Sequence, residues 1–312
     1  MIDSSTFLFR VFATLLVLLA AAFAMAFYSI ERQFEYAQYA LEAKGDEMRH
    51  WLDSYQMLLS SIADFPIMRK GNDTEIAEFL QIYDRINLPD IERLIFVNSK
   101  GIGYYHDGSV QPLADRIYYK VIVADQIVEQ MITNPYTPQF SDNLVIGIVR
   151  AVKDMNNDVK GALYVSISTA SLGENIRKFH FSEGSRMWLL DRTGRMFAHS
   201  HDTKHLMRLT LRQSDEYNYK GLRENADWIV EHRAGNVVYY DPDGVKMVAF
   251  FTPVPNSLGW ILGISAPYGG FAKTYYVYGA AMALAGLGMF IAFVIIHLMA
   301  KAARKRGKNS AA

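Results

Sequence analysis

Two long apolar stretches lie near the ends of the chain, at residues 11–30 and 275–300. Each holds about 20 or more residues, which is enough for a helix to cross the hydrocarbon layer of a bilayer. The residues between them, 31–274, have the mixed composition of a water-soluble domain. The pattern therefore predicts two membrane-spanning helices around one large folded segment, with a short N-terminus at residues 1–10 and a tail at residues 301–312.

The residues that follow the first apolar stretch show the repeat of an amphipathic helix. Apolar side chains recur there at steps of three or four residues: Met48, Leu52, Tyr55, Leu59 and Ile62. This spacing places them on one helical face. We expect a long helix over about residues 33–64, continuous with the first span and ended near Pro66, and a second helix over residues 73–85. The apolar face is expected to lie in a core or in a dimer seam.

Farther along the chain, short apolar and β-branched runs alternate with turn residues, which is typical of β-hairpins. Two pairs of segments resemble each other: 93–101 with 186–194, and 160–167 with 258–265. The first alignment also brings His106 opposite His199. Such internal similarity predicts two copies of one α+β unit, each built on an antiparallel sheet.

Composition and charge exclude several classes of protein. The chain has no Cys, which excludes a disulfide scaffold, cysteine-ligated zinc or iron–sulfur sites and thiol catalysis. Its 32 Lys and Arg balance 32 Asp and Glu, which argues against a nucleic-acid partner, because nucleic-acid binders usually carry a basic face. Two spans are too few for a typical transporter or channel.

The C-terminal tail sets the expected topology. It is basic throughout, with Lys301, Arg304, Lys305, Arg306 and Lys308 and no acidic residue. Loops rich in Lys and Arg stay in the cytoplasm, so both ends are expected inside and residues 31–274 outside. The alternative for the N-terminus is a cleaved signal peptide, because residues 22–26 resemble a small-residue cleavage site. The apolar run continues past that point, which favours an uncleaved anchor.

This arrangement of a long helix, two tandem sheet units and a closing span resembles the double Cache family of bacterial extracytoplasmic sensors. The most specific stretch is residues 115–119, Asp-Arg-Ile-Tyr-Tyr, followed by Pro135-Tyr136 and by the strand-turn-strand of residues 145–167. Residues 259–263 resemble the closing strand of the second unit. The similarity covers about residues 33–270.

The resemblance implies an α+β fold, with a long N-terminal helix and two tandem PAS-like (Cache) antiparallel-sheet units flanked by two transmembrane helices. The sensor would occupy residues 31–270, with a membrane-distal first unit at about residues 66–180 and a proximal second unit at about residues 181–268. It also implies a bacterial plasma (inner) membrane protein whose sensor is periplasmic or extracellular and whose ligand pocket lies in the first unit.

Candidate ligand-binding residues follow from the same resemblance. Amino-acid-binding members carry an Arg-x-Trp-Tyr motif, and this chain has Arg116, Tyr118 and Tyr119 in an Arg-x-Tyr-Tyr near match. The family also uses a later Tyr, for which Tyr136 is the candidate. An Arg can grip a carboxylate with two parallel donors, and tyrosines can wall a ligand and donate hydrogen bonds. The alternative is an Arg in a surface ion pair beside two packed tyrosines.

Two departures from the family pattern restrict the expected ligand. The amino-acid binders have acids for the ligand's ammonium group where this chain has Pro138 and Ser166. A buried ammonium without an acid is poorly compensated. We therefore expect a carboxylate or other small polar metabolite rather than a free α-amino acid. Ser166 stays a candidate ligand contact, and Asp107 or Asp142 could substitute for a missing acid.

Other polar clusters are expected to be structural. The segment with His199, His201, Asp202 and His205 resembles a zinc site, but a polar loop is the favoured interpretation. Residues 154–158 mimic the start of a calcium loop without its closing Glu, which favours a turn. Gly-x-Ser-x-Gly, His-Glu-x-x-His and P-loop motifs are absent. We expect no metal, no cofactor and no catalysis.

Two functions are consistent with this pattern. The first is a membrane-anchored receptor, working as a homodimer or with a signalling partner. The second is a non-catalytic accessory membrane protein with a degenerate pocket. Only residues 301–312 follow the second span, so an output module is expected in a separate protein or in a longer form of the chain. Small residues in the second span, such as Gly279, Ala283 and Gly286, favour close helix association.

Overall fold

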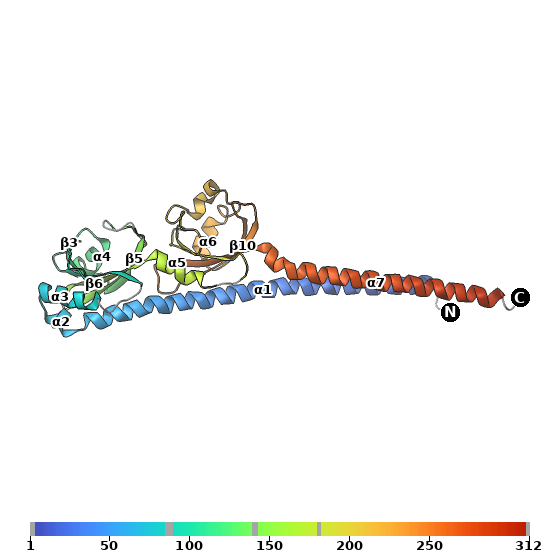
Figure 1. Ribbon diagram of the computed structural model, residues 1–312, viewed down its shortest axis with the longest axis horizontal. Helices are drawn as coiled ribbons and strands as arrows, with labels where there is room; N and C mark the ends of the chain where they lie inside the picture. The colour runs from blue at the N-terminus through green and yellow to red at the C-terminus, as the bar shows by residue number, and fades with distance from the viewer. Residues whose placement is uncertain (1–3, 85–89, 139–142, 180–181, 310–312) are drawn as a thin grey trace. The chain divides into compact units, whose positions relative to one another are not determined.

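The computed structural model describes residues 4–84, 90–138, 143–179 and 182–309. The chain divides into two compact parts. The helical part comprises Met1–Ala37 and Pro267–Ala312, and the sheet part comprises Gln38–Ala266. Figure 1 labels the helices and strands of both parts along the chain.

The helical part is built from two long helices. Helix α1 runs without a break over Ser4–Ala63, which confirms that the first apolar stretch continues into the amphipathic helix. Helix α7 covers Tyr268–Asn309. In the described part of the chain one segment, Gly279–Ile296, is apolar and long enough to cross a membrane. Many side chains of the expected first span lie outside the described residues. The ring of Phe34 packs edge-on against Phe271, with 5.1 Å between ring centres.

The first unit of the sheet part holds a six-stranded antiparallel sheet in the order β3-β2-β1-β6-β5-β4. Its helices and strands are α2 (Pro66–Lys70), α3 (Asp73–Asp84), β1 (Ile91–Asn98), β2 (Ile102–Tyr105), β3 (Val110–Pro112), α4 (Ile117–Tyr119), the π-helix η1 (Lys120–Ala124), β4 (Gln130–Ile132), β5 (Val145–Lys153), β6 (Val159–Ser168) and α5 (Thr169–Arg177). In Figure 1, α4 lies on the side of this sheet away from α1.

The second unit repeats this topology with five strands, in the order β8-β7-β11-β10-β9. Its elements are β7 (Arg186–Leu190), β8 (Met196–His199), the 3-10 helix η2 (Leu211–Tyr217), α6 (Ala226–His232), β9 (Gly235–Tyr240), β10 (Lys246–Pro253) and β11 (Ile261–Pro267). Because β8-β7-β11-β10-β9 corresponds strand by strand to β2-β1-β6-β5-β4, the predicted duplication of an α+β unit is confirmed.

Local chemistry explains why both units begin with the same hairpin. In the first unit the Asn98 side chain accepts hydrogen bonds from the backbone N–H groups of Lys100 and Ile102, at 3.0 and 2.9 Å. In the second unit Asp191 does the same for Thr193 and Arg195, at 2.8 and 3.1 Å. Each turn contains a glycine with positive φ, where a side chain would be strained.

The strand register corrects the alignment of the two copies at one point. Strand β2 pairs Tyr105 with Ile95, whereas β8 pairs His199 with Trp188. His199 therefore corresponds to Tyr105 and not to His106. A β-bulge between Leu189 and Leu190 shifts the second hairpin by one residue. Because neighbouring strand residues face opposite sides of a sheet, such a shift changes which side chain enters the core.

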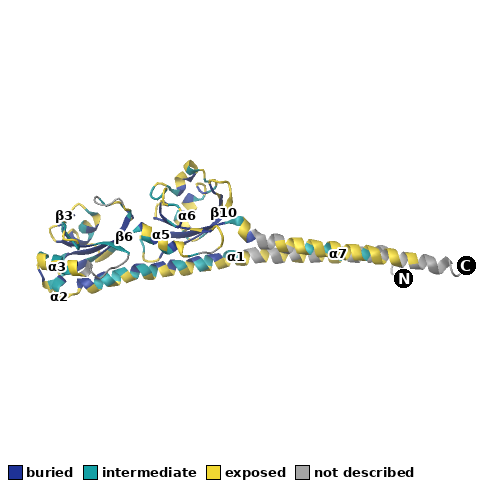
Figure 2. Ribbon diagram, viewed as in Figure 1, coloured by how far each residue is buried: buried dark blue, intermediate teal, exposed yellow. Residues whose placement is uncertain are grey.

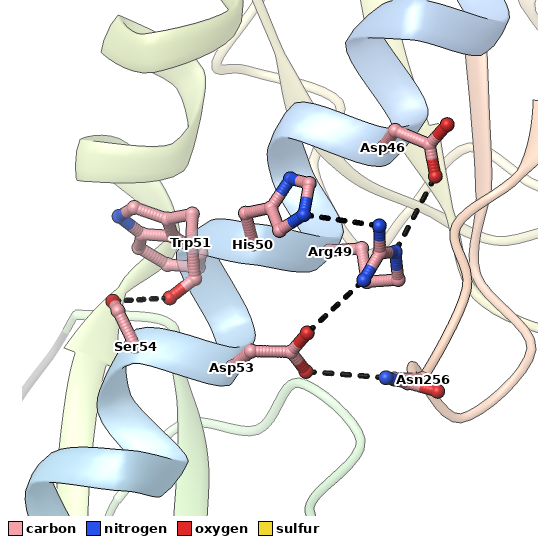
Figure 3. Close-up of polar contacts among 7 residues, drawn as sticks. All are labelled: Asp46, Arg49, His50, Trp51, Asp53, Ser54 and Asn256. Carbon is pink, nitrogen blue, oxygen red and sulfur yellow. Dashed lines mark hydrogen bonds and ion pairs between the residues drawn. The ribbon is translucent and has the colours of Figure 1, made fainter.

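The apolar stripe of α1 belongs to the core of the sheet part. Leu52, Leu59 and Ile62 have no exposed surface, and buried and exposed positions alternate along residues 38–63 (Figure 2). Polar contacts also hold this helix. Asp53 accepts a hydrogen bond at 3.2 Å from Asn256, in the turn between β10 and β11, and also pairs with Arg49 at 3.4 Å (Figure 3). The stripe is thus explained by core packing.

Candidate ligand-binding site

A cavity lies in the first unit, between its sheet and the segment formed by α4 and η1. It encloses about 520 Å³, part of which is open to solvent. Tyr118 and Ile122 of that segment pack in one buried cluster with Ile95 and Tyr164 of the sheet, so the cavity has a rigid support. The cavity is lined by Glu92, Arg93, Ile95, Tyr105, Leu113, Arg116, Tyr118, Tyr136, Pro138, Tyr164 and Ser166.

Four of the residues singled out from the sequence meet in this lining: Arg116, Tyr118, Tyr136 and Ser166. Tyr119 does not line the cavity, and its hydroxyl group donates a hydrogen bond to the carbonyl oxygen of Ser99 at 2.9 Å. Successive helical residues point about 100° apart, which is consistent with Tyr118 facing the cavity while Tyr119 reaches Ser99.

The two candidate substitute acids lie elsewhere. Asp107 is outside the lining, where it forms an ion pair with Arg93 and accepts hydrogen bonds from Ser109. Burial acts against ionisation, but the Ser109 hydrogen bonds and the Arg93 charge lower the pKa of Asp107 below its usual value. Asp142 lies outside the described residues. The ion pair with Arg93 already compensates the charge of Asp107, so a ligand would have to compete with Arg93 for this carboxylate.

A π-helical turn shapes the segment that carries Arg116. This residue immediately precedes α4 and has an extended backbone. The following residues form η1, in which the N–H of Asp125 donates to the carbonyl of Lys120 at 2.8 Å. This wider turn is rare and is often found at functional sites. Along this segment Tyr118 and Ile122 enter the core, while Arg116 lies in the lining of the cavity.

Tyrosine hydroxyl groups provide much of the polar lining. Tyr136 and Tyr164 share a hydrogen bond at 2.5 Å between their hydroxyl oxygens. The Tyr164 ring is accommodated by Gly147 of β5, where an added Cβ would lie 2.4 Å from the ring. Burial raises the pKa of Tyr105, Tyr118, Tyr136 and Tyr164 above the ordinary tyrosine value. The hydroxyl groups therefore stay protonated and can donate hydrogen bonds to an anion.

Arg116 is the cation that the described structure compensates least among the lining residues. Its side chain is 24% exposed, and its Nε lies 3.7 Å from the carboxylate of Asp115, which is itself 70% exposed. An exposed pair at this distance contributes little. Burial raises the pKa of Tyr105, Tyr118 and Tyr136, and the nearby positive charge of Arg116 partly opposes this rise. The guanidinium therefore lies close to these hydroxyl groups. The surface pair with Asp115 exists, but it leaves most guanidinium donors for another acceptor.

Ser166 is the second group that lacks a partner. The residue is 3% exposed, and its Oγ forms no hydrogen bond to any described residue. In the second unit the corresponding residue is Ser265, since β1 pairs Arg93 with Ser166 and β7 pairs Arg186 with Ser265. There Ser265 accepts a hydrogen bond from the indole N–H of Trp188 at 2.9 Å. Buried polar groups are nearly always paired, so the Ser166 hydroxyl indicates a place for a ligand or a bound water.

The sequence motif did not reveal Glu92, Arg93, Tyr105 or Tyr164 as cavity residues. All four are brought to the cavity by strand pairing, and Glu92 lies at an irregularity of the β1–β6 register. The Glu92 carboxylate accepts a hydrogen bond from Asn143 at 2.8 Å. In the sequence β1 is recognisable only as a short apolar run, which does not show which face of the sheet each residue takes.

The histidine-rich segment forms a hydrogen-bonded loop. His199 Nδ1 accepts the backbone N–H groups of His201 and Asp202, at 3.0 and 2.7 Å. Asp202 in turn contacts the ring of His205 at 2.5 Å. These contacts account for the polar residues without a bound ion, and no group of metal-ligating side chains was found among the described residues.

The fold and the cavity can now be compared with known proteins. A family model for the Cache domain, in its double form, matches residues 27–274. This chain belongs to the double Cache family. The match confirms the resemblance and the inferred α+β fold, with its long N-terminal helix and two antiparallel-sheet units. No curated protein matches the chain significantly.

Solved structures show the same double Cache fold at low sequence identity. The ligand-binding domain of the amino acid chemoreceptor PctB from Pseudomonas aeruginosa PAO1, in complex with L-Arg, has 17% identity and a TM-score of 0.62, covering 77% of this chain and 97% of that one. CtaA from Pseudomonas fluorescens, in complex with L-isoleucine, has 18% identity and a TM-score of 0.60, covering 78% and 96%. P. aeruginosa PctC, in complex with GABA, has 14% identity and a TM-score of 0.57, covering 75% and 99%.

The two equivalent serines should respond oppositely to the same substitution. Ser265→Ala removes the acceptor of the buried Trp188 N–H, so we expect a loss of about 1–3 kcal/mol in the free energy of unfolding. Ser166→Ala removes a hydroxyl group without a described partner, so the ligand-free protein should keep its stability or gain slightly. Denaturant unfolding of the full chain in nanodiscs would measure both. Equal losses in the two variants would show that Ser166 is satisfied in the ligand-free protein.

Proposed function

We propose that this protein is a membrane-anchored receptor that binds, without transforming it, a small carboxylate or other small polar metabolite in the cavity of the first unit. The observation that supports this most is the joint presence of Arg116 and Ser166 in one lining. One is a poorly compensated cation, and the other is a buried hydroxyl group without a described partner. Both deficiencies are removed by the same kind of ligand.

The lining suggests how such a ligand is held. A carboxylate can accept two parallel hydrogen bonds from the Arg116 guanidinium. Tyrosine hydroxyl groups around it donate further hydrogen bonds, and Ser166 can either donate to or accept from a second polar group of the ligand. Charge-assisted hydrogen bonds in a partly buried site are stronger than neutral ones, so we expect the carboxylate to dominate the affinity.

The ammonium half of an amino acid is served less well. The ligands of PctB, CtaA and PctC in the solved structures are L-Arg, L-isoleucine and GABA, which all carry an amino group besides a carboxylate. Among the described residues of the lining here, only Glu92 is acidic, and its carboxylate is already engaged by Asn143. We therefore propose a carboxylate without an α-amino group. The poorly compensated Arg116 and the Ser166 hydroxyl group, which has no described partner, favour this receptor over an accessory protein with a degenerate pocket.

Arg116→Ala should abolish ligand recognition. A panel of two- to six-carbon mono- and dicarboxylates, measured by calorimetry on the full chain in nanodiscs, would first identify a binder. Loss of a charge-assisted contact costs about 1.5–3 kcal/mol, so its affinity should fall about 10- to 150-fold in the variant. Arg150→Ala is the matched control. Arg150 lies on β5, its guanidinium donates a hydrogen bond at 3.1 Å to the side-chain oxygen of Gln130 on β4, and it does not line the cavity. Unchanged affinity in Arg116→Ala would refute the assignment.

The same titrations include amino acids. We expect the common L-amino acids to bind weakly or not at all, and micromolar binding of one would contradict the proposed ligand class. Glu92→Gln then identifies the cause. A strong loss of amino-acid binding in that variant would show that Glu92 replaces the acids that the family has at the positions of Pro138 and Ser166.

Membrane anchoring completes the proposal. The segment Gly279–Ile296 and the basic residues 301–308 support a C-terminal span with a cytoplasmic tail, and the first apolar stretch is proposed to provide the other span. Reporter fusions should therefore show an exported sheet part and a cytoplasmic C-terminus. Cytoplasmic activity from a fusion near residue 180 would exclude this topology.

Signalling is proposed to use self-association or a partner helix along α7, because small residues allow transmembrane helices to approach closely. The chain has no Cys, so single cysteines report cleanly. Cysteines at positions 283, 286 and 290 should cross-link periodically, to a second copy or to a partner, and the yields should change with ligand. A complete lack of cross-links at every helical phase would count against this route.

A further inference from the structure

A second cavity lies in the second unit, at the place that corresponds to the ligand cavity of the first. Its volume is about 650 Å³, including the part open to solvent, compared with about 520 Å³ for the first cavity on the same basis. The cross-strand pair Arg186 and Ser265 belongs to its lining, as the equivalent pair Arg93 and Ser166 belongs to that of the first. The second copy has therefore kept the cavity and has not filled it with larger side chains.

The walls of this second cavity differ in chemistry from those of the first. Most are apolar, with Leu190, Met196, Leu209, Leu211, Leu222 and Ile229 among them. The indole of Trp188 lies directly against Gly263, where an added Cβ would be 2.1 Å from the ring. The Trp188 N–H is bound by Ser265, so neither group remains open for a ligand. The polar part of the lining is formed by Arg186, His199, Tyr219, Tyr239, Asp241 and Ser265.

The lining holds one cationic and one anionic side chain. Arg186 and Asp241 carry opposite charges, and Asp241 Oδ1 is held by the backbone N–H groups of Asp243 and Val245, at 3.1 and 2.8 Å. His199, which also lines the cavity, is neutral, because burial lowers its pKa to about 4 although Asp202 opposes this shift. The lining thus has no net formal charge, whereas Arg116 gives the first cavity a cation to be matched.

We propose that the second unit binds an uncharged, mainly apolar small molecule, of the size of a substituted benzene, in this cavity. Transfer of an apolar ring from water onto leucine, isoleucine and methionine side chains is favourable. An ammonium group would meet only Asp241, whose Oδ1 already accepts two backbone N–H groups, and a carboxylate would meet only Arg186, whose exposed side chain is already hydrated. The site is independent of the ligand site in the first unit, so the receptor would have two inputs of different chemistry.

Three probes of nearly equal shape test the charge requirement: benzamide, benzoate and benzylamine. The full chain in nanodiscs is labelled with fluorotryptophan, and the ¹⁹F resonance of Trp188 is assigned with Trp188→Phe. Benzamide should shift this resonance saturably, with a Kd below about 1 mM. It should bind at least tenfold more tightly than either charged probe and leave Trp51, on α1, unaffected. The absence of a saturable shift, or equal binding of a charged probe, would overturn the proposal.

Matched variants of β10 locate the binding. Ala249 lines the cavity, whereas its neighbour Val248 is equally buried but does not. Ala249→Val should weaken benzamide binding at least tenfold, and Val248→Ile should leave it unchanged. Unchanged binding in a folded Ala249→Val protein would refute the site; if that variant does not fold, the three-probe comparison on the native chain decides alone. Arg116→Ala should also leave benzamide binding unchanged, and a loss there would refute the independence of the two sites.

Discussion

Pairing of the first and last long strands of each unit is the constraint on which the rest of the structure depends. Strands β1 and β6 are far apart in sequence, and so are β7 and β11, yet each pair forms the centre of its sheet. The antiparallel register sets Arg93 opposite Ser166 and Arg186 opposite Ser265. A slip by one residue would turn these side chains to the other face of the sheet. Both cavities therefore exist only in this register.

The two units share this strand pairing but differ in the position of one large aromatic residue, and this position determines whether the equivalent serine has a hydrogen-bond partner. In the second unit Trp188 lies over Gly263 and satisfies Ser265. In the first unit the opposite strand supplies the large ring, Tyr164, which packs over Gly147 and bonds to Tyr136. The exchange of a large and a small residue across one strand pair leaves Ser166 without a described partner. Two copies of one fold thus acquire a polar cavity and an apolar one.

The sequence predicted the long helix and the duplicated sheets from periodicity and internal similarity, and its resemblance to the double Cache family pointed to four members of the first cavity. It did not predict that Tyr119 would leave the cavity for Ser99, since that depends on how the α4 turn is phased. Nor did it predict Glu92 or Tyr105, whose positions follow from strand register, or the one-residue shift at His199, which follows from a bulge. A short motif does not reveal which distant strands pair or which face of the sheet each strand residue takes.

The features that support the proposed ligand site in the first cavity also bear on the stability of the ligand-free protein. A buried hydroxyl group and a partly buried guanidinium raise the free energy of the folded state unless they are paired, and among the described residues Ser166 has no partner and Arg116 has one weak partner. The surrounding core, from Ile95 to Tyr164, holds them in place nevertheless. A ligand that satisfies both groups binds only the folded form, so it must stabilise the first unit by mass action. The same two groups, Arg116 and Ser166, would thus account both for ligand binding and for the stabilisation that a ligand brings.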